Sequence, residues 1–168
     1  IGYAVPGLIL AVGMVQLLIY IDNSFLDSTS IVLTGSIFGL LLAYIIKTYA
    51  LANSSVESGY ERITSSMDDS SKLLGSTGWG MLARVHLPLL KTSFLTATLL
   101  VMSEVVKELP ATLILRPFNF ETLAVSTYIY AAEERMFQAA SPAIAIVLIG
   151  LIPIFFLSKM IRSSNKSG

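Results

Sequence analysis

Long apolar blocks alternate with shorter polar ones along the chain. A helix needs about 20 predominantly apolar residues to cross the hydrocarbon core of a bilayer. Apolar blocks of nearly this length cover residues 3–21, 31–52, 89–107 and 143–161. The pattern therefore predicts an all-α, polytopic membrane protein with four transmembrane helices.

Basic residues are distributed unevenly over the polar segments. Residues 22–30 include two acids and no Lys or Arg. The segment 53–91 and the C-terminal tail contain Arg62, Lys72, Arg84, Lys91, Lys159, Arg162 and Lys166. Because Lys and Arg are enriched on the cytoplasmic side of a membrane, we expect the loop 54–88 and the C-terminus to be cytoplasmic. Residues 22–30 and 110–141 then lie outside, although two arginines fall in the latter segment.

The composition agrees with a membrane location. Of the 168 residues, 54% are hydrophobic and 13% are charged, whereas a soluble domain carries about a quarter charged residues. The formal net charge is zero, so no overall field attracts nucleic acid. With no cysteine and one histidine, the sequence excludes disulfides, thiolate ligands and His-rich metal sites. It begins on Ile1 without a basic signal region, so we expect a piece of a longer protein.

The polar stretch MDDSSKLLGSTGWGMLARVHLPLL, between the second and third apolar blocks, carries helix start and stop signals. Ser66 and Asp69 fit a capping box, and Gly75 stands where a left-handed C-cap residue belongs. Thr77 can cap a second short helix, which Pro88 ends because its ring clashes with a continuing helix. The stretch is therefore predicted to form a helix–turn–helix elbow.

The elbow carries apolar side chains that have no core of their own to enter, namely Leu73, Leu74, Trp79 and Leu82. Two interpretations fit this pattern about equally well. The elbow either rests on lipid headgroups as a surface helix or docks on a soluble partner protein. We expect His86 to be a packing or headgroup residue rather than a ligand.

The spacing within the elbow resembles the "EAA" loop of ABC-importer permeases. That loop reads E-A-A, three residues, G, nine residues, I-x-L-P. Here the order is Asp69-Ser70-Ser71, three residues, Gly75, nine residues, Val85-His86-Leu87-Pro88. The glycine and the Leu-Pro pair match in identity, and the other positions match in charge, size or branching.

A second stretch, VKELPATLILRPFNFETLAVSTYIYAA at residues 106–132, is similar to the ferric-iron importer permeases. Their pattern is K-E-L-P-A-T-L-x-L-R-P-F-x-F-x-T-L-A. Residues 107–112, 115–118, 120 and 122–124 fit it. The resemblance covers nearly the whole chain, which is most like the later half of such a permease.

This resemblance implies the core of a type I ABC-importer permease, with residues 1–168 as one transmembrane domain in a bacterial inner membrane. The implied partners are a cytoplasmic ATPase dimer that holds ATP and Mg, a second permease half and a periplasmic binding protein, with no nucleic acid. The chain has no Walker lysine motif, so it is not expected to be an enzyme or to bind a cofactor itself. The ATPase-coupling residues would be Asp69, Ser70, Ser71, Leu73, Leu74, Gly75, Trp79, Val85, Leu87 and Pro88. Leu73, Leu74 and Trp79 would be apolar anchors, and Asp69 and Arg84 charges at the rim.

A second candidate site lies near the outer end of the third span, at Glu104, Lys107, Glu108 and Pro110. Glu104 and Glu108 are four residues apart, which places them on one helix face. Intramembrane charges are functional by default, so the two carboxylates could line the translocation route or gate and bind a hard metal cation. Alternatively, Lys107 pairs with Glu104 or with a neighbouring span and stabilises this end of the helix. Pro110 is expected to end the helix and turn residues 111–115 out as a re-entrant or outer-surface segment.

The cargo and the class of protein both have alternatives. The same machinery could carry a polyamine, thiamine, a phosphonate or an oxyanion, although the acidic pair favours a cation such as ferric iron. A channel-like or scaffold membrane protein is a less favoured alternative from another class.

Overall fold

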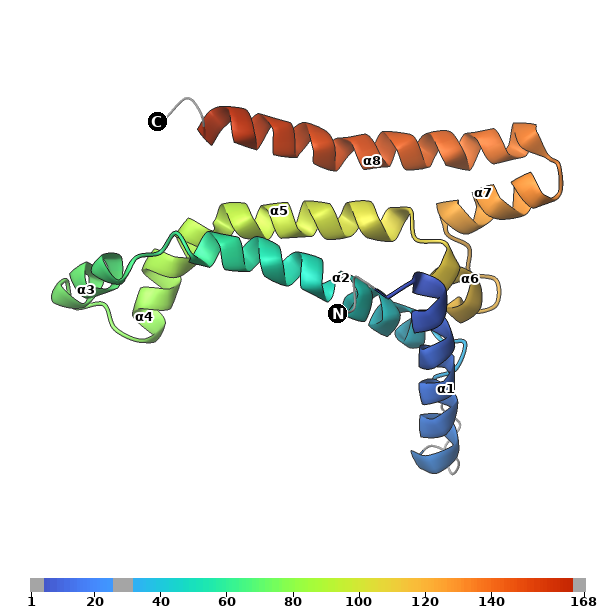
Figure 1. Ribbon diagram of the computed structural model, residues 1–168, viewed down its shortest axis with the longest axis horizontal. Helices are drawn as coiled ribbons and strands as arrows, with labels where there is room; N and C mark the ends of the chain where they lie inside the picture. Colours follow the sequence, from blue (N-terminus) through green and yellow to red (C-terminus); the bar gives the residue numbers. More distant parts are fainter. Residues whose placement is uncertain (1–4, 26–31, 165–168) are drawn as a thin grey trace. The chain divides into compact units, whose positions relative to one another are not determined.

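The computed structural model describes residues 5–25 and 32–164, with side chains to residue 159 (Figure 1). Part of the predicted outer loop, including Asp27, and Lys166 of the tail lie outside the described residues. The described residues form helices and no strand: α1 (Gly7–Phe25), α2 (Ile37–Tyr60), α3 (Ser65–Leu73), α4 (Trp79–Met81), η2 (Leu82–His86), α5 (Leu87–Val106), α6 (Pro110–Leu115), α7 (Leu123–Ala132) and α8 (Met136–Ser164).

Four helices in the described part are long and apolar enough to cross a membrane, namely Gly7–Phe25, Ile37–Tyr60, Trp79–Val106 and Met136–Lys159. The predicted all-α class with four spans is therefore confirmed. The third helix begins earlier than expected because the chain stays helical through α4, η2 and α5 instead of breaking at Pro88. Most of the apolar side chains on these helices are exposed, as in helices that face lipid.

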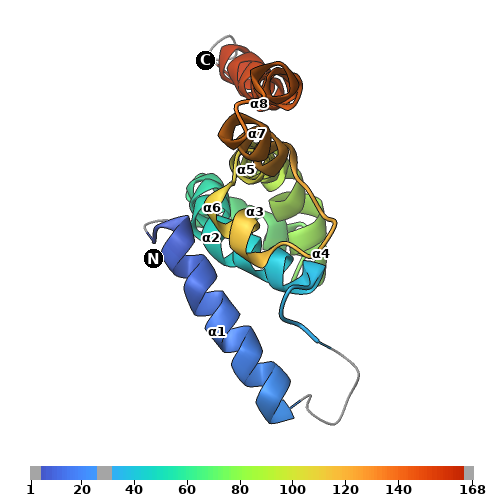
Figure 2. The same ribbon diagram turned by 90° about the vertical axis from the view of Figure 1, so that its right-hand side faces the viewer.

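The chain divides into two compact units, which are described separately: Ile1–Ala50 with Met102–Gly168, and Leu51–Val101. In the first unit, α1 packs against α6 near the start of α1 (Figure 2). The core of this unit consists of Ala11, Met14, Leu18, Leu40, Ala43, Ala111 and Leu115. The expectation of an outer-surface segment at residues 111–115 is wrong, because Ala111, Thr112 and Leu115 are buried; the re-entrant alternative stays a prediction. Pro110 occupies the first turn of α6, where a missing N–H is not needed.

Hydrogen bonds cap the two ends of α7 and fix the end of α1. In α7, the Thr122 side chain caps the first turn, and Arg135 N–H donates to the Tyr130 carbonyl after the last turn at 2.8 Å. There the chain reverses, and α7 packs against α8 (Figure 1). Asp22, predicted in the outer loop, belongs to α1 and accepts bonds from the N–H groups of Leu33 and Thr34, both at 2.9 Å. These bonds join the end of α1 to the chain that leads into α2.

In the second unit, α2 and α5 approach each other at Gly59 and Ser93. A Cβ atom on Gly59 would collide with the Ser93 side chain and lie 3.3 Å from Leu90 Cδ2. Small residues at helix crossings permit such close packing in membranes, where lipid offers no hydrophobic drive for helix association.

We expect Gly59→Ala to lower the midpoint of thermal denaturation in detergent by about 5 °C, because the methyl group overpacks this crossing. Gly150→Ala is the matched control, since it also lies within a helix and no atom lies within 4 Å of its added Cβ. The control should leave the midpoint unchanged or raise it, because Ala favours helix over Gly. Equal midpoints for the two variants would contradict the close crossing.

Candidate functional site

The first half of the elbow is the short helix α3 and its C-terminal turn. The helix begins at Ser65 with Thr64 as the N-cap residue, whose side chain does not cap a backbone N–H but lies 2.9 Å from the Ser66 hydroxyl. The predicted capping box, with Ser66 as N-cap, is therefore wrong, because the helix starts before Ser66. At the other end, Gly75 adopts φ +80°, and the bonds Gly75 N–H to Lys72 O (2.9 Å) and Ser76 N–H to Ser71 O (3.0 Å) form a Schellman motif. The predicted left-handed glycine cap is confirmed.

The second half of the elbow continues into the third span without a break. Gly78, not the predicted Thr77, is the N-cap residue of α4. The turn η2 is π-helical, and the Leu87 N–H donates to the Leu82 carbonyl five residues back. This wider turn stands directly before Pro88, where an α-helix would bring the proline ring against the carbonyl four residues earlier. The predicted stop at Pro88 is therefore wrong, since the π-helical turn makes room for the proline.

Three apolar side chains of the elbow are almost fully exposed: Leu73 at 89%, Leu74 at 86% and Trp79 at 81%. The exposed Asp69 carboxylate pairs with Lys72 at 3.0 Å, and Arg84 is exposed as well. Leu82, expected to be exposed with the others, is half-buried. The structure thus confirms that most of the elbow's apolar residues enter no core of the described chain.

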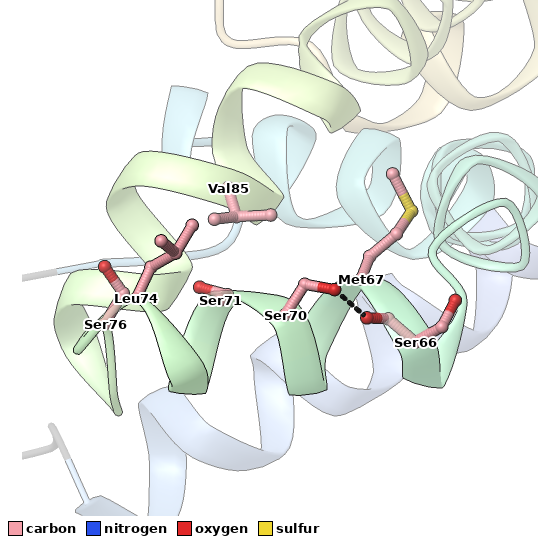
Figure 3. Close-up of a pocket in the computed structure, with 7 residues that line it drawn as sticks. All are labelled: Ser66, Met67, Ser70, Ser71, Leu74, Ser76 and Val85. Atoms are coloured by element: carbon pink, nitrogen blue, oxygen red, sulfur yellow. Dashed lines mark hydrogen bonds between the residues drawn. The ribbon is translucent and has the colours of Figure 1, made fainter.

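A shallow groove of about 400 Å³ runs between α3 and the helical segment that contains Val85 (Figure 3). Its lining combines serine hydroxyls with apolar groups and consists of Ser66, Met67, Ser70, Ser71, Leu74, Ser76 and Val85. The Ser70 hydroxyl donates to the Ser66 carbonyl at 2.8 Å (Figure 3). Within the described residues, the buried Ser71 hydroxyl has no hydrogen-bond partner. Ser70, Ser71 and Val85 therefore lie together, whereas Leu87 and Pro88 are exposed at the start of α5.

His86 is buried at 6% exposure, in agreement with the expected packing role. Its Nε2 lies 2.8 Å from Asp68 Oδ1 of α3, and its ring meets the Tyr60 ring edge-on at 5.8 Å. No motif in the sequence indicates these partners. Asp68 and His86 are 18 residues apart, so no local spacing rule joins them.

In the other unit, the acidic pair predicted at the outer end of the third span is divided between two ion pairs. Oε1 of the half-buried Glu104 lies 2.8 Å from Nζ of the exposed Lys107, and this is the structural pairing expected as the alternative. Glu108 is buried and pairs with Lys47 of α2. The expectation that Glu104 and Glu108 share a helix face is wrong, because α5 ends at Val106 and Glu108 follows it.

The pair of Lys47 and Glu108 is the centre of a buried polar cluster. Glu108 Oε1 also accepts from the N–H of Ala111 at 3.2 Å, and the Glu108 carbonyl accepts from the Thr112 hydroxyl at 2.8 Å. Thr112 is in turn 2.6 Å from the Tyr44 hydroxyl. The Lys47 side chain is only 18% exposed because it turns to Glu108. A Cβ on Gly7 would lie 2.7 Å from Glu108 Oε1, so α1 needs a glycine there.

No group of three or more His, Asp or Glu side chains in the described residues is arranged to hold a metal ion. Glu104 and Glu108 each have a cationic partner. Their role as metal ligands or gate residues stays a prediction, and it would require both carboxylates to exchange their present partners.

The four long apolar helices, with a polar elbow between the second and third, define a multi-pass helical membrane protein. No family model matches the chain. The chain is 26% identical over 157 residues to "Fe(3+)-transport system permease protein FbpB 2" of Haemophilus influenzae, a match that covers 94% of this chain. It is 29% and 30% identical over 136 residues to the "Putative 2-aminoethylphosphonate transport system permease protein PhnV" of Salmonella typhimurium and Salmonella choleraesuis, covering 81% of this chain.

The chain spans 29% of the length of the Haemophilus relative and 50% of the two Salmonella relatives. All three are named as permeases of transport systems and not as enzymes. The resemblance to importer permeases, expected from the elbow spacing and from residues 106–132, is therefore confirmed.

We expect Glu108→Leu to destabilise the protein by about 3 kcal/mol, because it leaves the ammonium of Lys47 buried without its partner. The double variant Lys47→Met/Glu108→Leu should recover most of this loss, since two apolar side chains replace the pair. Thermal denaturation in detergent measures both effects. Glu133→Gln, which breaks the exposed pair with Arg135, is the control and should change stability by less than about 1 kcal/mol. A double variant less stable than Glu108→Leu would contradict this account.

Proposed function

We propose that the chain is part of the permease of an ABC importer in a bacterial inner membrane. In this proposal, the loop 54–88 is cytoplasmic and couples the membrane helices to a separate ATPase dimer that holds ATP and Mg. A second permease half and a periplasmic binding protein complete the assembly. The observation that carries the proposal is the elbow, which presents Leu73, Leu74 and Trp79 almost fully exposed beside the glycine turn.

The composition of α3 favours docking on a protein over resting on lipid headgroups. Helices that lie on a membrane combine a continuous apolar face with many Lys and Arg residues. In α3, the sequence SSMDDSSKL has two apolar residues, one Lys and two Asp. The exposed apolar groups instead gather at its C-terminal turn and at Trp79. A small apolar cluster with a polar surround is typical of the centre of a protein interface, where Trp residues contribute much of the binding energy.

Two local features suit the elbow to transmit movement. Gly75 allows a tight turn in which the backbone can approach a partner closely. The helix then continues without interruption from Trp79 to Val106, so a displacement at the docked end is carried along a helix into the membrane. When ATP closes the ATPase dimer, the elbow would move and the spans would change between inward-open and outward-open states.

Ferric iron is the cargo that we propose first. The similarity of residues 106–132 to ferric-iron permeases and the Haemophilus relative, which matches 94% of this chain, support it. A phosphonate such as 2-aminoethylphosphonate is the second candidate, favoured by the Salmonella relatives at 29% and 30% identity.

We expect Leu73→Ala/Trp79→Ala to reduce capture of the partner ATPase by tagged full-length permease about 100-fold, since aromatic anchors at interface centres can contribute more than 2 kcal/mol each. Copurification in detergent at several ATPase concentrations measures the effect. Phe118→Ala is the control, because Phe118 is 99% exposed but lies outside the elbow. The importer proposal fails if the wild-type permease retains no ATPase, or if the double variant captures it as well as the wild type.

The cargo is tested in vesicles that contain the full permease, its ATPase and its binding protein. We expect the binding protein loaded with ferric iron to stimulate ATP hydrolysis, because loaded binding protein favours the closed ATPase dimer. The same protein presented with 2-aminoethylphosphonate should give only basal hydrolysis. Stimulation by 2-aminoethylphosphonate alone would overturn the iron assignment and leave the importer proposal intact.

A further inference from the structure

His86 lies where three helical segments of the unit Leu51–Val101 meet. It belongs to η2, its Nε2 is 2.8 Å from Asp68 of α3, and its ring packs edge-on against Tyr60 at the end of α2. The side chain is 6% exposed. Because a carboxylate only accepts hydrogen bonds, the N–H of His86 Nε2 is the donor and Asp68 Oδ1 is the acceptor. Such a bond is shorter and stronger than one between neutral groups.

The backbone between α3 and α4 is a poor means of passing movement from one helix to the other. It consists of a short turn in which Gly75 and Gly78 both have positive φ angles, +80° and +53°. Glycines at these angles have wide conformational freedom, so α3 could tilt on this turn without moving the helix that follows. A second connection is needed if displacement of the docked α3 is to reach α5.

The bond between Asp68 and His86 is that second connection. All residues of Leu51–Val101 are described, and among them this is the one hydrogen bond between α3 and the helix from Leu82 onward. The neighbouring Asp69 makes no such link, because it pairs with Lys72 within α3. Position 86 is also within the π-helical turn, and single π-turns inside α-helices are frequent at functional sites.

We propose that His86 and Asp68 are positioning residues that make α3 and the start of α5 move together, so that displacement of the elbow by the ATPase is transmitted to the third span. The inference rests on the proposed function and adds to it the side-chain pair that carries the coupling. His86 and Asp68 are both set back from the exposed apolar cluster of Leu73, Leu74 and Trp79, so docking and transmission are assigned to different residues.

The first test separates docking from transmission in the full assembly, reconstituted in vesicles with the partner ATPase and the binding protein. The probes are ferric iron and 2-aminoethylphosphonate, each presented with the binding protein. We expect His86→Ala and Asp68→Ala to capture the ATPase as the wild type does, but to lower stimulated ATP hydrolysis by roughly tenfold, a typical coupling effect. His86→Gln, which keeps an N–H donor near the Nε2 position, should recover most of the stimulation. Thr98→Ala is the control, because Thr98 is exposed on α5 outside the elbow, and it should retain the stimulation.

The outcomes distinguish this inference from the proposed function. If the wild-type permease captures no ATPase, the proposed function fails. If the wild type captures the ATPase and His86→Ala keeps full stimulation, the inference alone fails. Parallel loss of capture and stimulation in His86→Ala and Asp68→Ala, with no recovery in His86→Gln, would show that the pair only folds the elbow, and would also overturn it.

A second measurement does not depend on the cargo. The sequence contains no cysteine, so spin labels can be attached within it at Ser66→Cys on α3 and Lys91→Cys on α5, both exposed positions. Double electron–electron resonance should give one narrow distance distribution, with and without ATP and vanadate, when the partner ATPase is bound. His86→Ala should broaden this distribution and Thr98→Ala should not. An equally narrow distribution in His86→Ala would overturn the inference.

Discussion

The packing of α1, the start of α2 and α6 depends on one interaction, the ion pair of Lys47 and Glu108. Polar groups away from water must find partners within the protein, and this pair determines what can surround it. Gly7 has to lack a side chain where α1 passes Glu108. The Glu108 carboxylate also accepts the N–H of Ala111 in the first turn of α6. The Thr112 and Tyr44 hydroxyls extend the same network to α2, beside an apolar core made of small residues and leucines.

The elbow follows a different principle, because its apolar groups are left exposed while its polar groups are partly buried. The Schellman turn at Gly75 satisfies the carbonyls at the end of α3 and leaves Leu73 and Leu74 almost fully exposed. Asp68, Ser71 and His86 lie on the inner side. Exposed apolar groups and buried polar groups both destabilise an isolated loop. A partner protein that covers the exposed side chains would offset this cost. The π-helical turn at η2 then joins this surface to a spanning helix without the break that Pro88 alone would cause.

Prediction rules that use only neighbouring residues were correct where one short stretch of sequence determines the local structure. The four spans were predictable because each is an uninterrupted apolar block, and the turn at Gly75 because a left-handed cap selects glycine. Local rules failed at Pro88, since a π-helical turn five residues long can accommodate a proline that an α-helix rejects. They did not predict the short helix that begins at Pro110 and buries Ala111, Thr112 and Leu115.

The sequence by itself determined the class of protein, the number of candidate spans and the resemblance of the elbow to an importer coupling loop, because apolar length and residue spacing are properties of the chain alone. Only the tertiary structure decided which charges pair. Glu108 binds Lys47 from a position 61 residues away, and Asp68 binds His86 from one 18 residues away. Charged side chains withdrawn from water take whichever partner the packing of the helices brings near, and that packing depends on many small contacts summed over distant parts of the chain.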